Sequence, residues 1–278
     1  MLADLHIHTT ASDGIYAPEE ILQMALVAKI SVISITDHDN TAGFITAKKY
    51  LEAQALPIKL LPGLEIDTYI EDRDVHILGY HIDPYYKPLS EALEWTRNGR
   101  VKRIEEMLLK LNALGYAISQ DEVAAEAKLS QSIGRPHIAR VMVKKDYFKT
   151  EKEVFDKLIA RGKPGFCKQK KLSPQEVISL IQEAGGIAFL AHPSELRSIS
   201  FAKKILKTYN FAGVEVWHPS AFYCKEVEIW LNLAKKMKLL TSGGSDFHGN
   251  KDRYPTKLGI FKVSYDNVKS VVKWKQKS

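Results

Sequence analysis

The sequence predicts an α/β fold in which strands and helices alternate around a parallel sheet or barrel, with a helical insertion. Short apolar runs with the pattern of buried strands recur along the chain, and stretches with helical spacing separate them. Between Leu89 and Arg161 the strand pattern disappears and several helical stretches follow one another. The alternation predicts βα units, and the interruption predicts the insertion.

The expected strands are short and apolar, as buried strands of a βα fold are. They lie at Leu2–His8, Val32–Thr36, Leu60–Ile70, Val75–His81, Ile187–His192, Val214–His218, Leu239–Ser245 and Leu258–Val263. A charged stretch from Glu71 to Asp74 separates the third and fourth of them, which predicts a hairpin at that point.

The expected helices fall between these strands and within the insertion. They lie at Pro18–Lys29, Thr41–Ala55, Trp95–Leu114, Ile138–Lys145, Glu176–Ala184, Phe201–Tyr209 and Ala221–Met237. Pro18 and Pro174 stand where a proline is tolerated in a first turn, and Gly185 with Gly186 predicts a helix end.

The composition is that of an ordinary globular protein. The chain has 278 residues, of which 45% are hydrophobic and 26% charged, and no run approaches the roughly 18 apolar residues of a membrane span. The first residues lack a basic stretch before an apolar one, so a secretory signal is not expected. Two cysteines, Cys167 and Cys224, cannot form a disulfide framework. We therefore expect a reduced, cytoplasmic protein without membrane association.

The positive charge is concentrated in one central segment. Residues 95–171 contain 18 basic and 9 acidic side chains, whereas the rest of the chain contains 22 basic and 24 acidic ones. Clustered Lys and Arg raise the local concentration of polyanions, so a phosphate-bearing partner is one interpretation. A solvated helical surface is the other, and charge alone does not distinguish them.

Histidines and acidic residues collect where the predicted strands end. His6 and His8 are two positions apart on the first strand, so their side chains project from the same face. The later members are Asp13, His38, Glu65, His76, His192, Asp246 and His248. Because the carboxyl ends of βα strands converge on one rim of a barrel, we expect most of these side chains to meet there.

Such a rim predicts a metal site. A lone histidine is more often a hydrogen-bonded core residue, and Asp37 and Asp39 could simply cap the helix near Thr41. Nine donors in one place, however, would repel one another or lose hydration unless cations hold them together. Imidazoles mixed with carboxylates favour Mn²⁺, Fe²⁺ or Zn²⁺, and the set is large enough for two or three ions. Because neighbouring ions of this kind activate water and stabilise a displacement at phosphorus, we expect metal-dependent hydrolysis of a phosphoester.

The motifs around these residues resemble those of the PHP (polymerase and histidinol phosphatase) superfamily. The resembling stretches run from residue 2 to about residue 249 and comprise Asp4–His8, Ser12–Gly14, Thr36–Asp39, Pro62–Glu65, Ala191–Pro193 and Gly244–His248. The resemblance implies a distorted (β/α)7 barrel, similar to a TIM barrel, with a trinuclear site that usually holds manganese, iron or zinc. The barrel would comprise residues 1–88 and 164–278, and the basic helical insertion, residues 89–163, would cover the active site.

The resemblance also implies a role for each residue of the rim. His6, His8, Glu65 and Asp246 would bind one metal, and Glu65 would bridge to a second that His76 and His192 also hold. Asp13, His38 and His248 would bind the third. A metal-bridging hydroxide would attack phosphorus, with His218 and His248 as candidate catalytic residues. His218 could contact a phosphate oxygen or protonate the leaving group, or it could support a metal ligand.

Within the superfamily, the chain resembles the branch of 3′,5′-nucleoside bisphosphate phosphatases and a related 5′→3′ exoribonuclease. The insertion carries Arg100, Arg103, Arg135 and His137, which we expect to bind a second phosphate of the substrate. Arg100 and Arg103 could instead pair with Glu105 or Glu106 on a helix surface.

These observations predict a phosphoesterase, most simply with Mn²⁺, that removes the 3′-phosphate of 3′,5′-bisphosphonucleotides and trims short RNA from its 5′ end. The predicted partner is a phosphorylated nucleotide or short RNA, with no obligate protein partner. Histidinol-phosphate phosphatase is one alternative. A PHP-type module that binds nucleic acid and has lost catalysis is another.

Overall fold

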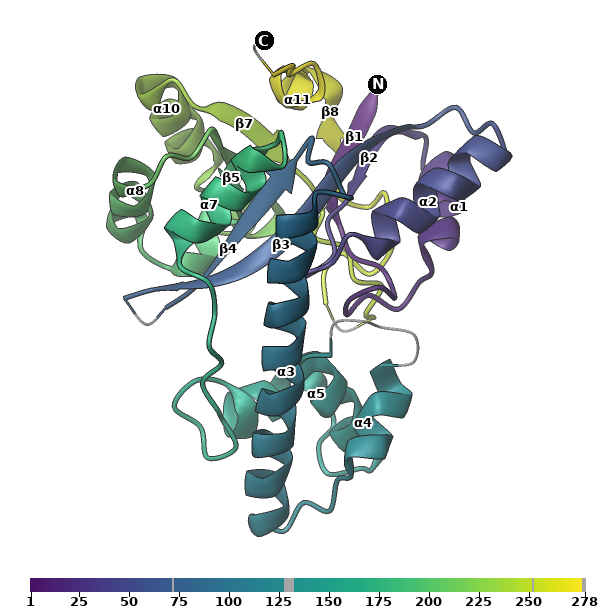
Figure 1. Ribbon diagram of the computed structural model, residues 1–278, viewed down its shortest axis with the longest axis vertical. Helices are drawn as coiled ribbons and strands as arrows, with labels where there is room; N and C mark the ends of the chain where they lie inside the picture. Colours follow the sequence, from purple (N-terminus) through teal and green to yellow (C-terminus); the bar gives the residue numbers. More distant parts are fainter. Residues whose placement is uncertain (72, 128–132, 252, 277–278) are drawn as a thin grey trace.

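The computed structural model describes residues 1–278 apart from 72, 128–132, 252 and 277–278, and its strands form one curved sheet (Figure 1). The strands are β1 (Leu2–Ile7), β2 (Ile30–Ile35), β3 (Lys59–Ile70), β4 (Arg73–Tyr80), β5 (Ile187–Leu190), β6 (Gly213–Trp217), β7 (Leu240–Gly243) and β8 (Val263–Ser264). Their order in the sheet is β7-β6-β5-β4-β3-β2-β1-β8, and the sheet is nearly closed into a barrel. The predicted α/β barrel is confirmed.

Two of the predicted features of the sheet have different outcomes. The hairpin is confirmed, since β3 and β4 pair antiparallel from Gly63 with Tyr80 to Ile70 with Arg73, although residue 72 lies outside the described residues. The predicted strand Leu258–Val263 is wrong, because only Val263 and Ser264 pair with β1. Gly259 has a φ of 87°, which turns the chain where a strand would have to run straight.

The chain that follows β7 approaches β1 closely, so that the sheet is nearly closed on this side. Ile7 of β1 forms a bridge with Phe247, and His8 N donates to the carbonyl of Phe247 at 2.9 Å. A Cβ on Gly244 would lie 2.3 Å from the backbone nitrogen of His6, so only glycine allows this approach. The same contact places Asp246 beside His6 of β1 and beside His8, which follows this strand.

The barrel helices are α1 (Pro18–Val27), α2 (Ala42–Ala53), α7 (Pro174–Glu183), η2 (Pro193–Leu196), α8 (Ile199–Thr208), α9 (Pro219–Tyr223), α10 (Val227–Met237) and α11 (Tyr265–Val272). Pro18 and Pro174 occupy first turns as predicted, and Gly185 follows the end of α7 with a φ of 80°. The prediction of one helix over Ala221–Met237 is wrong. Lys225 adopts a φ of 60°, which separates α9 from α10.

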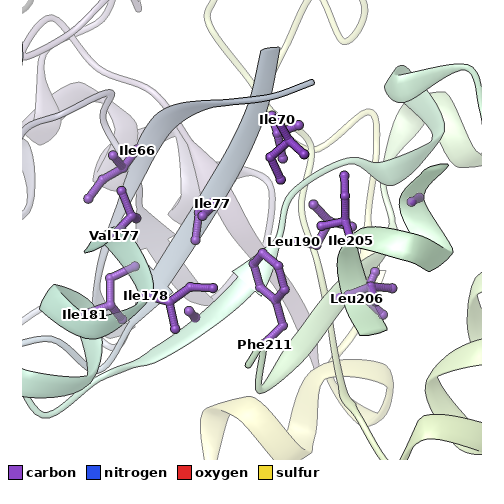
Figure 2. Close-up of a cluster of buried hydrophobic side chains, with 14 of the residues drawn as sticks. Ile66, Ile70, Ile77, Val177, Ile178, Ile181, Leu190, Ile205, Leu206 and Phe211 are labelled. Atoms are coloured by element: carbon purple, nitrogen blue, oxygen red, sulfur yellow. The ribbon is translucent and has the colours of Figure 1, made fainter. Parts of the chain in front are cut away.

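The largest apolar core lies between the sheet and helices α7 and α8 (Figure 2). Ile66 and Ile77 of the hairpin and Leu190 of β5 belong to this core, together with Ile178 of α7 and Ile205 of α8. All five side chains are buried. This packing holds β3, β4 and β5 rigidly, and these strands carry several side chains of the site described below.

The insertion is helical, as predicted, and extends away from the barrel along one long helix (Figure 1). It comprises α3 (Lys87–Ala113), α4 (Gln120–Ala127), α5 (Arg135–Lys144), α6 (Glu151–Val154) and the π-helical turn η1 (Phe155–Ile159). A separate core forms within it, in which Met107 and Leu111 of α3 belong to the same cluster as Ile138 and Met142 of α5. Boundaries at residues 88 and 164 remain a prediction. Among the described residues, no helix is both long and apolar enough to cross a membrane, since even the long helix α3 is too polar.

Candidate metal centre

The nine histidines and acids predicted from the sequence lie together at one end of the barrel. Their ligand atoms form overlapping groups whose members lie within 4.8 Å of one another: His6, His8, Glu65 and Asp246; Glu65, His76 and His192; and His8, Asp13, His38 and His248. We call these nine residues the rim cluster. Seven of them are buried, and His38 and His76 are partly exposed. The expectation that they meet in space is therefore met.

Two of these side chains depend on an unusual backbone at a strand end. His192 follows β5 with a φ of 23°, and Asp246 follows β7 with a φ of 53°. Left-handed backbone costs free energy for residues other than glycine, and it persists where the surrounding structure requires it. Here both side chains contact other members of the cluster, with His192 Nε2 3.0 Å from Glu65 Oε1 and Asp246 Oδ1 3.4 Å from His6 Nε2.

The first donor group has the spacing of a metal coordination shell. His6 Nε2 lies 3.1 Å from His8 Nε2, 3.3 Å from Glu65 Oε2 and 3.4 Å from Asp246 Oδ1. His8 Nε2 lies 3.2 and 3.1 Å from the same two oxygens. Ligands about 2.1 Å from a tetrahedral ion would be about 3.4 Å apart. The four donors therefore fit a single cation between them.

Glu65 connects the first group to the second through its two oxygens. Its Oε1 lies 3.0 Å from His76 Nδ1 and 3.0 Å from His192 Nε2. Its Oε2 faces His6 and His8, and it also lies 3.3 Å from His38 Nδ1. One carboxylate thus touches five imidazoles, which is the arrangement of a bridging ligand.

The third group is centred on Asp13. Its Oδ1 lies 3.3 Å from His248 Nε2 and 3.7 Å from His8 Nδ1. Asp13 Oδ1 and His38 Nδ1 are buried and make no hydrogen bond within the part of the chain that the structure describes. Burial of such atoms without a partner is costly, and a cation would satisfy both.

Hydrogen bonds at the outer nitrogens orient two of the rings. His6 Nδ1 lies 3.0 Å from Glu215 Oε1, and Glu215 is fully buried. His248 Nδ1 donates to the carbonyl of Asp246 at 2.8 Å. Each bond leaves Nε2 directed into the rim cluster, as in metal-binding histidines whose second nitrogen is held by a carboxylate or carbonyl.

The electrostatics favour ionised carboxylates and an added cation. Burial raises the pKa of Glu65, but the imidazoles of His38, His6 and His76 more than offset it, so that the pKa lies well below its usual range. Burial opposes the charge of His38, yet Glu65, Asp67 and Asp13 raise its pKa to about 10. Burial, Arg253 and His8 lower the pKa of His248 to about 4, so its ring stays neutral. Ionised carboxylates are the form that binds metals, and the negative charge that favours a proton on His38 would equally favour a bound cation in its place.

Sequence reasoning missed three charged residues of this site. Glu215 holds His6 and accepts a hydrogen bond from the backbone nitrogen of His192 at 2.8 Å. Asp67 lies 3.2 Å from His38 and 3.3 Å from His76. Arg253 donates to Asp246. The sequence held a signal for Glu215, a charged residue between Val214 and Val216 in an apolar strand. It also held one for Asp67, which lies two positions after Glu65.

Arg100 joins the insertion to the barrel rim. Its Nε donates to Asp39 Oδ2 at 2.7 Å and its Nη2 to Asp67 Oδ2 at 2.8 Å, and the side chain is buried. These donors are occupied by carboxylates of the barrel and not by Glu105 or Glu106. A role of Arg100 in binding phosphate remains a prediction, and its partners in the structure are acidic.

The other three predicted substrate residues are placed differently. Arg103 Nε donates to the carbonyl of Cys167 at 2.8 Å, and its Nη2 is buried without a hydrogen bond among the described residues. The nitrogen of Gly134 donates to His137 Nδ1 at 3.0 Å, where α5 begins. Arg135 is partly exposed, and its nearest carboxylate oxygen, on Asp74, is 3.7 Å away. Of the three arginines, Arg135 thus has the most solvent-exposed side chain.

His218 stands beside the rim cluster at the end of β6. The backbone nitrogen of Ser220 donates to His218 Nδ1 at 3.2 Å, so a neutral ring carries its hydrogen on Nε2. His218 Nε2 is buried and lies 3.5 Å from Asp246 Oδ2. In that form it is a hydrogen-bond donor directed toward Asp246 of the rim cluster.

Known proteins are similar to this chain in sequence and in fold. Residues 4–185 match the model of the PHP domain. The chain belongs to the PHP domain family. It is 32% identical to a 5′-3′ exoribonuclease, Rnm, of Escherichia coli over 89% of this chain and 85% of that protein. It is 31% identical to a 3′,5′-nucleoside bisphosphate phosphatase of Chromobacterium violaceum over 88% and 86%.

A solved structure of a candidate metal-dependent phosphoesterase from Bifidobacterium adolescentis has a similar fold. It superposes with a TM-score of 0.85 at 30% identity and covers 97% of this chain and 95% of its own. The predicted family is confirmed, and the chain is a metal-dependent phosphoester hydrolase of the PHP family.

A substitution of Glu215 tests whether the outer hydrogen bonds matter for metal binding. Glu215→Gln keeps the size of the side chain but removes its charge. Loss of the outer hydrogen-bond partner of a metal-binding histidine typically lowers metal affinity about 10- to 100-fold, and we expect a loss of Mn²⁺ affinity in that range. Isothermal titration of metal-free protein with Mn²⁺ measures it. Unchanged affinity in a folded variant would contradict a supporting role of Glu215.

Proposed function

We propose that the protein hydrolyses the 3′-phosphate of 3′,5′-bisphosphonucleotides and that the same reaction removes nucleotides from the 5′ end of short RNA. Both substrates carry a phosphoester at a 3′-oxygen of a nucleotide whose 5′-position bears phosphate. The relatives named above carry the names of these two activities. The observation that carries the proposal is the rim cluster, with its coordination-like donor spacing, beside an insertion rich in Lys and Arg.

The proposal assigns the rim cluster as ligands of two or three divalent cations, most simply Mn²⁺, with Fe²⁺ or Zn²⁺ as substitutes. The cations would activate water and neutralise phosphate charge. Glu215 orients His6, and His218 Nε2 is placed to donate a hydrogen bond to a phosphoryl oxygen. A cytoplasmic location, where nucleotides and RNA are present, is part of the same proposal.

A substrate panel tests the proposal. Protein loaded with Mn²⁺ is incubated with adenosine 3′,5′-bisphosphate, AMP, histidinol phosphate and a 5′-phosphorylated oligoribonucleotide, and released phosphate and nucleotides are measured. We expect activity on the first and the last. Preference for histidinol phosphate would replace the proposal with that activity. Nucleic-acid binding without turnover of any substrate would favour a lapsed catalytic module.

Arg135 is the residue of the insertion that we assign to the second phosphate. Its side chain lies near the rings of Phe155 and Phe166, at 5.7 and 5.9 Å, which position the guanidinium without occupying its donors. Charge-assisted hydrogen bonds contribute about 1.5–3 kcal/mol each.

For Arg135→Ala we expect kcat/KM for adenosine 3′,5′-bisphosphate to fall by about 10- to 100-fold, mostly through KM. A substrate with only the 3′-phosphate, adenosine 3′-monophosphate, should lose less than threefold. The exposed Lys102, replaced by Ala, is the matched control on the insertion. Equal losses on both substrates would rule out the second-phosphate role.

A further inference from the structure

A cavity of about 760 Å³ opens beside the rim cluster, on the side of β6 and β7. Its outer wall is formed by Phe222, Tyr223, Tyr254, Ile260 and Phe261. We call this cavity the aromatic pocket. It is lined by α9 and by the chain that follows β7. Arg100 of the insertion contacts a different part of the rim, namely Asp39 after β2 and Asp67 in β3.

Three of the four aromatic side chains of this pocket are unusually exposed, and Phe261 is buried. Tyr223 is 91% exposed, and Tyr254 and Phe222 are 57% and 52% exposed. Ile260 is half exposed as well. Isolated exposed apolar residues need no explanation, but a group that lines one cavity indicates a binding surface. The ring of Phe222 is fixed edge-on against Phe261, with centroids 5.3 Å apart, so part of the surface is preformed.

The inner end of the pocket is polar and belongs to the metal centre. His218, Asp246 and Arg253 form part of its wall. His218 Nε2 is buried and makes no hydrogen bond in the described structure, and it lies 3.5 Å from Asp246 Oδ2. A ligand that fills the pocket therefore places a polar end at the rim and an apolar, flat end against aromatic rings.

We propose that the aromatic pocket binds the nucleobase of the nucleotide whose 3′-phosphate lies at the metal centre. The inference rests on the proposed function and adds the subsite that distinguishes a nucleotide from other phosphate esters. The volume lies in the range of sites for small organic ligands, about 300–1,000 Å³. Stacking on aromatic side chains accepts every base, and the outer wall is mostly apolar, so we infer weak selectivity among bases.

The experiment compares two substrates that differ only in the base. One is adenosine 3′,5′-bisphosphate, and the other is methyl ribofuranoside 3,5-bisphosphate, which lacks a base. The variants are Phe222→Ala, Tyr223→Ala and the double variant. Tyr85→Ala is the control, because Tyr85 is 65% exposed and precedes α3 outside the pocket.

Bases stack favourably on aromatic side chains, so we expect kcat/KM of the double variant for the nucleotide to fall at least about tenfold. The base-free substrate should change less than twofold, and Tyr85→Ala should change neither. Equal losses on both substrates, or an unchanged nucleotide rate, would overturn the assignment of the pocket to the nucleobase while the phosphatase proposal stands.

If neither substrate is hydrolysed, the proposed function fails, and a binding measurement still decides on the pocket. Equilibrium dialysis of AMP and ribose 5-phosphate then compares the wild type with the double variant. A loss of AMP affinity of about tenfold, without a loss for ribose 5-phosphate, supports the pocket. Equal affinities in both proteins overturn it.

Discussion

Replacement of Glu65 by Gln should lower kcat for adenosine 3′,5′-bisphosphate by about a thousand-fold or more. The two oxygens of Glu65 lie 3.0–3.3 Å from nitrogens of five histidines in three donor groups. An amide keeps the shape but loses the charge, and its nitrogen cannot bind a cation. A loss of roughly 4 kcal/mol of transition-state stabilisation is typical when metal-based charge stabilisation is removed. Steady-state kinetics measures the lower kcat, and the metal content of the purified variant measures the loss of bound cations.

Glu52→Gln is the matched control for this experiment. Glu52 lies at the surface of α2, with its side chain 61% exposed, and its ion pair with Lys48 is 3.9 Å long. Such pairs contribute little to stability, so kinetics and metal content should equal those of the wild type. If Glu65→Gln kept both its full metal content and more than about a tenth of the rate, Glu65 would not be the bridging ligand.

The rim cluster could be predicted from the sequence because its members are tied to local patterns. His6 and His8 share a face through the alternation of a strand, and His192 and Asp246 lie two and three residues after strands that are recognisable as apolar runs. Once a barrel is assumed, strand ends converge, and no knowledge of side-chain conformation is needed. Distant segments were thus placed together by topology alone.

The distant partners of Glu215 and Arg100 could not be predicted in the same way. Glu215 contacts His6 across 209 positions of the chain, and Arg100 contacts Asp39 across 61. Nothing in the local pattern of α3 distinguishes Arg100, which is buried against the barrel, from its exposed neighbour Lys102. Such pairs depend on how the insertion packs on the rim, which periodicity does not encode.

Arg100 provides a link between the insertion and the metal centre. Its carboxylate partner Asp67 also lies beside His38 and His76, and Lys171 lies 3.6 Å from Asp67. The positive charges of Arg100 in the insertion and of Lys171 in the barrel thus balance a carboxylate that would otherwise face only other acids and imidazoles. The insertion is therefore held at the rim by charge as well as by its covalent connections.

Replacement of Arg100 by Met should lower the free energy of unfolding by about 3–5 kcal/mol. The substitution keeps much of the apolar stem but leaves Asp39 and Asp67 without their shared cation, and removal of one partner of a buried ion pair typically costs that much. Both carboxylates are at least nine-tenths buried, so water cannot replace the lost charge. Urea unfolding of the metal-free protein, followed by circular dichroism, measures the difference.

Two further variants distinguish the charge effect from the loss of a long side chain. Lys102→Met, on the exposed face of the same helix, should unfold within about 0.5 kcal/mol of the wild type. Asp39→Asn added to Arg100→Met should recover part of the loss, because it removes one uncompensated charge. Asn tolerates the left-handed backbone that Asp39 adopts, with a φ of 50°, so the added change introduces little strain. If the double variant were less stable than Arg100→Met alone, the loss would come from packing around the guanidinium and not from the unpaired carboxylates.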